Sequence, residues 1–95
     1  MEIKITNRQA LILLELEGSE FDIGVWRPDI AEELGTASTT IYDNLIKLRK
    51  KKLIERYETT DGKKGRNRIY WYATDLGNKA IRVIKNGLNI TNSII

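Results

Sequence analysis

Apolar residues recur at helical spacing in four segments of the chain, at residues 6–17, 28–35, 36–51 and 74–87. The third segment shows the pattern most clearly. Ile41, Leu45 and Leu48 stand at positions i, i+4 and i+7, which is typical of a helix with one buried stripe. Because only a short connection with Gly35 separates this segment from the second, the pair predicts a helix-turn-helix.

The first helical segment is apolar on more than one stripe. It begins at Thr6, which can form a capping box with Gln9, and its apolar residues follow from Ala10 to Leu16. A surface helix of a small domain needs only one apolar stripe. We therefore expect this helix to bury a second face against another helix or a partner chain.

Two segments later in the chain predict the strands of a hairpin. Residues 53–59 have the composition of a strand, and residues 69–73 are rich in aromatic side chains. Between them, residues 60–68 hold two glycines and four basic side chains, which suits a flexible tip. The stretch 21–26 is expected to be a linker or a brief edge strand.

The last helix is expected to start at a Thr74 cap and to end at Asn86-Gly87. An apolar tail over residues 88–95 then remains without an obvious core to join. Since the first helix also has surplus apolar surface, we expect a symmetric homodimer, with residues 88–95 as its candidate dimerisation tail.

Composition excludes several classes of protein. The 95 residues leave room for one small domain, residues 1–95, and no apolar run approaches the ~20 residues of a membrane helix. The chain has no Cys and no His, so the usual thiol nucleophile, imidazole base and metal ligands are missing. We expect no enzymatic activity, no cofactor, no metal site and, without a targeting segment, a cytoplasmic location.

Charge is divided unevenly along the chain, although the formal net charge is only +3. The part up to Gly35 carries 3 basic and 8 acidic residues, whereas the part from Thr36 on carries 13 basic and 5 acidic residues. A basic C-terminal part on a protein of pI about 9.3 is typical of a surface that binds a polyanion. The alternative is a solvated surface rich in lysine.

The order of elements and several short motifs resemble one known family. The segments IAEELG (30–35), LRKKKLIER (48–56), DGKKGRNRIYWYA (61–73) and TDLGNKA (74–80), with the hydroxyl-rich run between the first two, are similar to winged-helix transcriptional regulators of the MarR and PadR kind. The resemblance covers roughly residues 6–86. It implies an α+β winged helix-turn-helix fold with three helices, a β-hairpin wing and a C-terminal helix. The chain departs from the family at Ala37-Ser38, where members often carry Ser then Pro, and largely lacks the flanking dimerisation helices.

The resemblance implies that a recognition helix at about 38–51 enters the major groove of DNA. The basic wing, residues 60–68, would lie on the DNA backbone or in the minor groove. The candidate DNA-binding residues are Arg27, Ser38, Thr39, Thr40, Tyr42, Asn44, Lys47, Lys63, Lys64, Arg66 and Arg68. Hydroxyls at a helix start can also serve only as caps, and Asp43 is expected to orient a neighbour because phosphates repel it. Asn44 is a candidate partner of adenine.

Two functions remain open from the sequence. The first is a sequence-specific, double-stranded DNA-binding transcriptional regulator that acts as a homodimer. The second is a winged-helix protein–protein interaction module of a transcription or replication complex that does not read DNA sequence. The basic wing favours the first, and the acidic N-terminal part offers a surface for the second. The sequence identifies no small-molecule effector. Trp26, Tyr70, Trp71 and Tyr72 suit either stacking on bases or packing in a core or interface.

Overall fold

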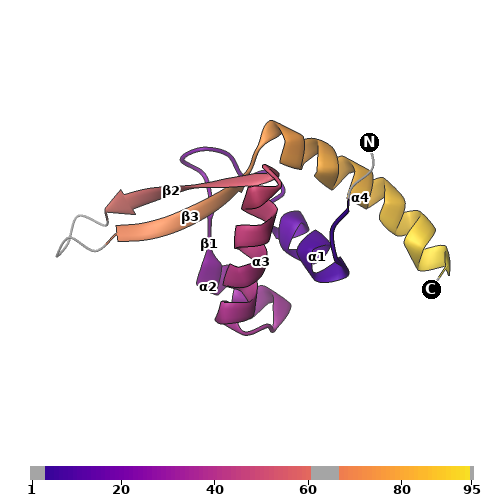
Figure 1. Cartoon of the computed structure of the whole chain (residues 1–95), viewed down its shortest axis with the longest axis horizontal. Coiled ribbons are helices and arrows are strands. Elements are labelled where there is room, and N and C mark those ends of the chain that lie inside the picture. The colour runs from indigo at the N-terminus through magenta and orange to yellow at the C-terminus, as the bar shows by residue number, and fades with distance from the viewer. Residues whose placement is uncertain (1–3, 61–66, 95) are drawn as a thin grey trace.

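The computed structural model describes the backbone of residues 4–60 and 67–94, and the side chains of these residues up to Gly87. Its helices and strands follow the order expected from the sequence (Figure 1). They are α1 (Asn7–Glu15), β1 (Val25–Trp26), α2 (Arg27–Leu34), α3 (Ser38–Lys50), β2 (Ile54–Thr60), β3 (Asn67–Ala73) and α4 (Asp75–Ile94). The fold is therefore the α+β winged helix that the sequence predicts.

The strands form an antiparallel sheet in the order β1-β3-β2. The register pairs Tyr57 with Tyr70 across the hairpin and Val25 with Trp71 at the short edge. The last two residues of the stretch 21–26 are thus a brief edge strand. Figure 1 shows the hairpin of β2 and β3 projecting from the helices at one end of the molecule and α4 extending at the other.

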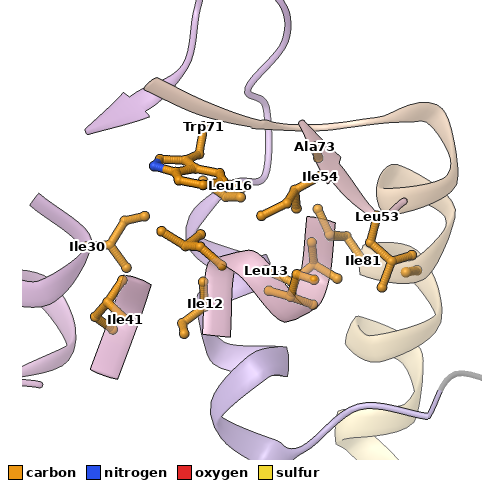
Figure 2. Packing of buried hydrophobic residues seen from close by; sticks show 13 residues of the cluster. Ile12, Leu13, Leu16, Ile30, Ile41, Leu53, Ile54, Trp71, Ala73 and Ile81 are labelled. Atoms are coloured by element: carbon orange, nitrogen blue, oxygen red, sulfur yellow. The ribbon is translucent and has the colours of Figure 1, made fainter. Parts of the chain in front are cut away.

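One hydrophobic cluster joins the three N-terminal helices, the sheet and α4. Figure 2 shows these side chains converging from the helices and the sheet. The stripe Ile41, Leu45 and Leu48 of α3 is completely buried, and Trp71 of β3 is 1% exposed. Burying one leucine or isoleucine side chain stabilises a fold by about 1.5–3 kcal/mol. Together, the buried side chains of this cluster hold the sheet against the helices.

The α1 helix buries two sides, as its apolar surplus predicts. Its start is the capping box of Thr6 and Gln9, in which each side chain accepts a hydrogen bond from the backbone N–H of the other. Ile12, Leu13 and Leu16 are fully buried in the cluster, and α1 contacts α2, α3 and α4. Leu11 remains half exposed.

The end of α1 is attached to the sheet by a buried hydroxyl. Ser19 donates a hydrogen bond to the carbonyl of Leu16 and accepts one from the backbone N–H of Ala73 at 2.9 Å. Gly18 and Gly35 both have positive φ, of 83° and 60°, at the left-handed positions after α1 and α2 where the sequence expects helix ends.

Two boundaries differ from the sequence expectation. The last helix continues to Ile94 and does not end at Asn86-Gly87, because a glycine inside a helix costs only about 1 kcal/mol and does not by itself stop it. Asn67 and Arg68 belong to β3, where they pair with Thr60 and Thr59, and not to the hairpin tip. No helix in residues 4–60 and 67–94 combines the length and apolarity needed to cross a membrane.

The start of α4 lies directly against the backbone that precedes β2. The Thr74 hydroxyl caps α4 by accepting from the N–H of Gly77 at 3.1 Å, and it donates to the carbonyl of Lys52 at 2.8 Å. A Cβ at Gly77 would lie 1.9 Å from the carbonyl oxygen of Leu53. Only glycine permits so close an approach of two backbones.

We expect Gly77→Ala to destabilise the fold by at least about 2 kcal/mol, because the added methyl group meets backbone that cannot turn away. The matched control is Gly87→Ala in the same helix, where a Cβ meets nothing within 4 Å. This control should stabilise α4 by up to about 1 kcal/mol. The free energy of unfolding from denaturant titrations measures both. Equal effects of the two substitutions would contradict the close packing at Gly77.

Candidate nucleic-acid interface

The start of α3 presents hydroxyl side chains that do not cap it. The N-cap residue is Ala37, and no side chain forms a capping hydrogen bond there. Thr39 is exposed, Ser38 and Thr40 are partly exposed, and the first turn contains no acidic residue. The amide groups of a helix start attract phosphate. The hydroxyls of Ser38, Thr39 and Thr40 therefore do not serve as helix caps, and this end of α3 suits contact with an anion.

Tyr42 stands beside the buried stripe of α3 and links three elements. Tyr42 is 36% exposed, and its ring meets Trp71 of β3 edge-on, with 6.4 Å between the ring centroids. The guanidinium carbon of Arg27, the first residue of α2, lies 4.9 Å from the centre of the Tyr42 ring. Arg56 of β2 lies 5.6 Å from the Trp71 ring. These cation–π contacts hold two arginines against the protein surface.

The base of the wing carries a similar pair. The guanidinium carbon of Arg68 lies 4.5 Å from the centre of the Trp26 ring. Beside it, the Asn67 amide accepts a hydrogen bond from the Thr60 hydroxyl at 3.1 Å and donates one to Glu58 at 3.2 Å. The predicted wing residues Lys63, Lys64 and Arg66 lie outside the described residues.

A cavity of about 450 Å³ opens between the start of α2, α3 and the base of the wing. It brings together residues of four elements, β1, α2, α3 and β3, and none of its described lining residues is acidic. They are Trp26, Arg27, Pro28, Tyr42, Asn67, Arg68, Ile69 and Trp71. We call this cavity the basic groove. Of the predicted DNA-binding residues, the structure gathers Arg27, Tyr42 and Arg68 in it.

Asn44 has a different environment from the one its sequence position suggests. Its amide group donates to the carbonyl of Thr40 at 2.8 Å and accepts from the buried Gln9 side chain at 3.2 Å. Contact with adenine would therefore require both hydrogen bonds to break. Asn44 connects α1 to α3, and this connection depends on a residue 35 positions away that no local pattern indicates. Lys47 is exposed one turn further along α3.

Two carboxylates near the helices have shifted pKa values. Arg49, near the end of α3, forms an ion pair with Glu55 at 2.6 Å, and this hydrogen bond is the main reason why the pKa of Glu55 is lowered. The pKa of Glu15 is raised by burial and then by repulsion from Glu33. Arg49 is thus neutralised within the protein, whereas Arg27 and Arg68 stack on rings without an ion pair among the described residues.

Sequence reasoning missed the partners of these arginines. The sequence is compatible with either base stacking or packing for Trp26 and Trp71. In the structure, Trp71 is buried in the core, and both rings carry a stacked arginine. Arg56 was not singled out, because its place beside Trp71 depends on the strand register. No group of three or more carboxylates that could hold a metal ion occurs in the part of the chain that is described.

No protein-family model matches this chain, and no curated protein sequence matches it significantly. Solved structures do. In the MepR–DNA complex of Staphylococcus aureus, the matching MepR chain has 30% sequence identity to this chain. The TM-score is 0.76, and the match covers 95% of this chain and 62% of the MepR chain. The transcriptional regulator SlyA is 26% identical, with a TM-score of 0.76 over 94% of this chain and 58% of that one.

ZitR of Lactococcus lactis has a TM-score of 0.77 over 99% of this chain and 60% of that one, but at 22% identity it bears on the fold alone. The chain thus spans about three fifths of the length of these structures. All three neighbours are winged-helix transcription regulators of the MarR family. The chain therefore has the winged-helix fold of MarR-family transcription regulators and resembles them over nearly its whole length.

Proposed function

We propose that this chain is a sequence-specific, double-stranded DNA-binding transcription regulator. The observation that carries the proposal is the basic groove, where Arg27 and Arg68 are held on aromatic rings beside the uncapped start of α3. The likeness to MepR, which was solved in complex with DNA, supports the same function. No described residue of the groove is acidic, so nothing in it repels a phosphate backbone.

In this proposal α3 lies in the major groove, which is about 12 Å wide and admits one helix. Its apolar stripe is buried, and Thr39, Tyr42 and Lys47 lie on exposed positions. Thr39 and its neighbours Ser38 and Thr40 supply hydroxyls to base edges or phosphates, and Lys47 supplies a charge to the backbone. We assign Asn44 a structural role, because its amide group is already used within the protein.

The two stacked arginines bind the DNA backbone from different elements. Arg27 comes from the start of α2, and Arg68 comes from the base of the wing. Stacking restricts both side chains before binding, so less conformational entropy is lost when a phosphate arrives. Lys63, Lys64 and Arg66 would extend this contact along the tip of the wing toward the backbone or the minor groove.

A homodimer completes the proposal. Leu11 of α1 and Leu76 and Val83 of α4 are 50%, 39% and 39% exposed, and α4 runs for 20 residues to Ile94. A second copy packed on these helices would bury the exposed apolar surface, with residues 88–95 as part of the contact. Two recognition helices would then read half-sites about 34 Å apart or a multiple of it.

DNA binding should depend on salt through the two stacked arginines. A selection from random duplexes should yield a preferred sequence, and fluorescence anisotropy then gives its affinity across a salt titration. Arg27→Ala and Arg68→Ala should each reduce the slope of log K against log salt by about 0.9, because each removes one phosphate contact. The control Arg82→Ala, at an exposed position of α4 outside the groove, should leave the slope unchanged. Failure to bind duplex even at low salt contradicts the proposal.

Two substitutions at Tyr42 separate the contribution of its ring from that of its hydroxyl. Tyr42→Ala removes the platform under Arg27 but no charge, so it should weaken duplex binding roughly 2–5-fold, the equivalent of a cation–π contact, at an unchanged salt slope. Tyr42→Phe keeps the ring and should bind as the wild type does. If Phe is as weak as Ala in the same anisotropy assay, the hydroxyl and not the stacking is what matters.

The proposed homodimer can be tested on the exposed apolar side of α4. Val83→Glu places a charge on the exposed apolar side of α4 and should convert the dimer to a monomer in sedimentation equilibrium. The control Arg82→Glu changes charge at an exposed position about 100° around the same helix from Val83 and should leave the dimer intact. A wild-type chain that stays monomeric at all concentrations would refute the homodimer.

A further inference from the structure

A tight turn between α1 and β1 exposes two large apolar side chains. Glu20 and Ile23 exchange backbone hydrogen bonds of 3.0 and 2.8 Å, and Asp22 between them has a positive φ of 74°. Phe21 is 66% exposed and Ile23 is 62% exposed. Small polar residues and glycine are the usual occupants of such turns, because they make the turn without exposing apolar area to water. Two large apolar residues here therefore need another explanation.

The turn is fixed to the sheet behind it. The backbone N–H of Gly24 donates a hydrogen bond to the Tyr57 hydroxyl at 2.7 Å. A Cβ on Gly24 would lie 2.9 Å from both the carbonyl oxygen of Trp71 and the Cβ of Tyr70, so the backbone approaches the sheet as closely as glycine allows. The turn is therefore held in one position, with its apolar side chains pre-organised.

Phe21 packs on a row of tyrosines. Its ring centroid lies 5.4 Å from that of Tyr57 and 6.1 Å from that of Tyr72, and Tyr57 stacks on Tyr70 at 5.6 Å. Tyr70 and Tyr72 flank Trp71 in β3, so they point to the opposite side of the sheet from the buried tryptophan. We call Phe21, Ile23, Tyr57, Tyr70 and Tyr72 the Phe21 surface. It faces away from α3, because Trp71 contacts Tyr42 on the other side.

The charges in the turn that carries Phe21 are negative. Arg68 lies on the same side of β3 as Tyr70, and its guanidinium group stacks on Trp26. Glu20 and Asp22 in the turn are exposed, and neither forms an ion pair within residues 4–60 and 67–94. No lysine or arginine occurs between Arg8 and Arg27. These carboxylates repel phosphates, so the surface does not suit DNA. In a two-fold contact centred on this turn, each turn would meet its copy and like charges would come together.

We propose that the Phe21 surface docks a partner protein through a segment in which an apolar or aromatic side chain is flanked by arginine or lysine. The apolar side chain would pack on Phe21 and Ile23, and the cations would pair with Glu20 and Asp22. Rigid aromatic residues supply contact area at low entropic cost and dominate the binding energy of protein interfaces. The chain thus carries this surface on the side of the sheet that faces away from α3.

The test is a selection of random 12-residue peptides, displayed on phage, against the immobilised full chain. Counter-selection uses the double variant Phe21→Ser, Ile23→Ser, whose substitutions lie at exposed positions. Its fold is checked by circular dichroism and thermal unfolding. We expect the enriched peptides to combine lysine or arginine with an apolar or aromatic residue. Synthetic copies of them should bind this variant at least tenfold more weakly than the wild type.

A second variant, Glu20→Gln with Asp22→Asn, keeps the apolar side chains and the turn. It should weaken binding of the same peptides several-fold, and more at low salt than at high salt. The control Leu76→Ser removes an exposed apolar residue of α4 and should bind them as the wild type does. No enrichment, peptides without basic residues, or equal binding to the Phe21→Ser, Ile23→Ser variant overturns the proposal. A change of oligomeric state in that variant also overturns it, because the occupant would then be a second copy.

Discussion

The burial of Trp71 is the constraint on which the rest of the structure depends. This side chain stands on the central strand of the sheet and is 1% exposed in the core that α1, α2 and α3 complete. Its ring also meets Tyr42 and carries Arg56, so one residue connects the core, α3 and the wing. Because the packed interior cannot deform gradually, the position of Trp71 sets the angle between α3 and the wing.

The alternation of β3 separates the buried Trp71 from the tyrosines that support Phe21. Trp71 faces the helices, whereas Tyr70 and Tyr72 face the opposite side and support Phe21. A slip of one residue in the register would exchange these sets, so the buried tryptophan protects both. Charge also differs between the two sites, since the groove contains Arg27 and Arg68 while the turn contains Glu20 and Asp22.

Local sequence signals predicted most of the fold because they act over short distances. The stripe from Ile41 to Leu48, the capping box at Thr6 and the glycine after α2 are all confirmed. The predicted end of α4 at Asn86-Gly87 is wrong, since Gly87 does not stop a helix by itself. The bonds of Asn44 and the stacking of Arg68 on Trp26 could not be predicted, because they join residues brought together only by tertiary packing.

The most direct test of this account is a map of amide chemical shifts on the ¹⁵N-labelled full chain during titration with the selected duplex. The account predicts shifts centred on the start of α2, the first two turns of α3 and the base of the wing at Arg68, with little change at Phe21 and its turn. Shifts centred on the turn from Glu20 to Ile23, or no shifts at saturating DNA, would contradict it.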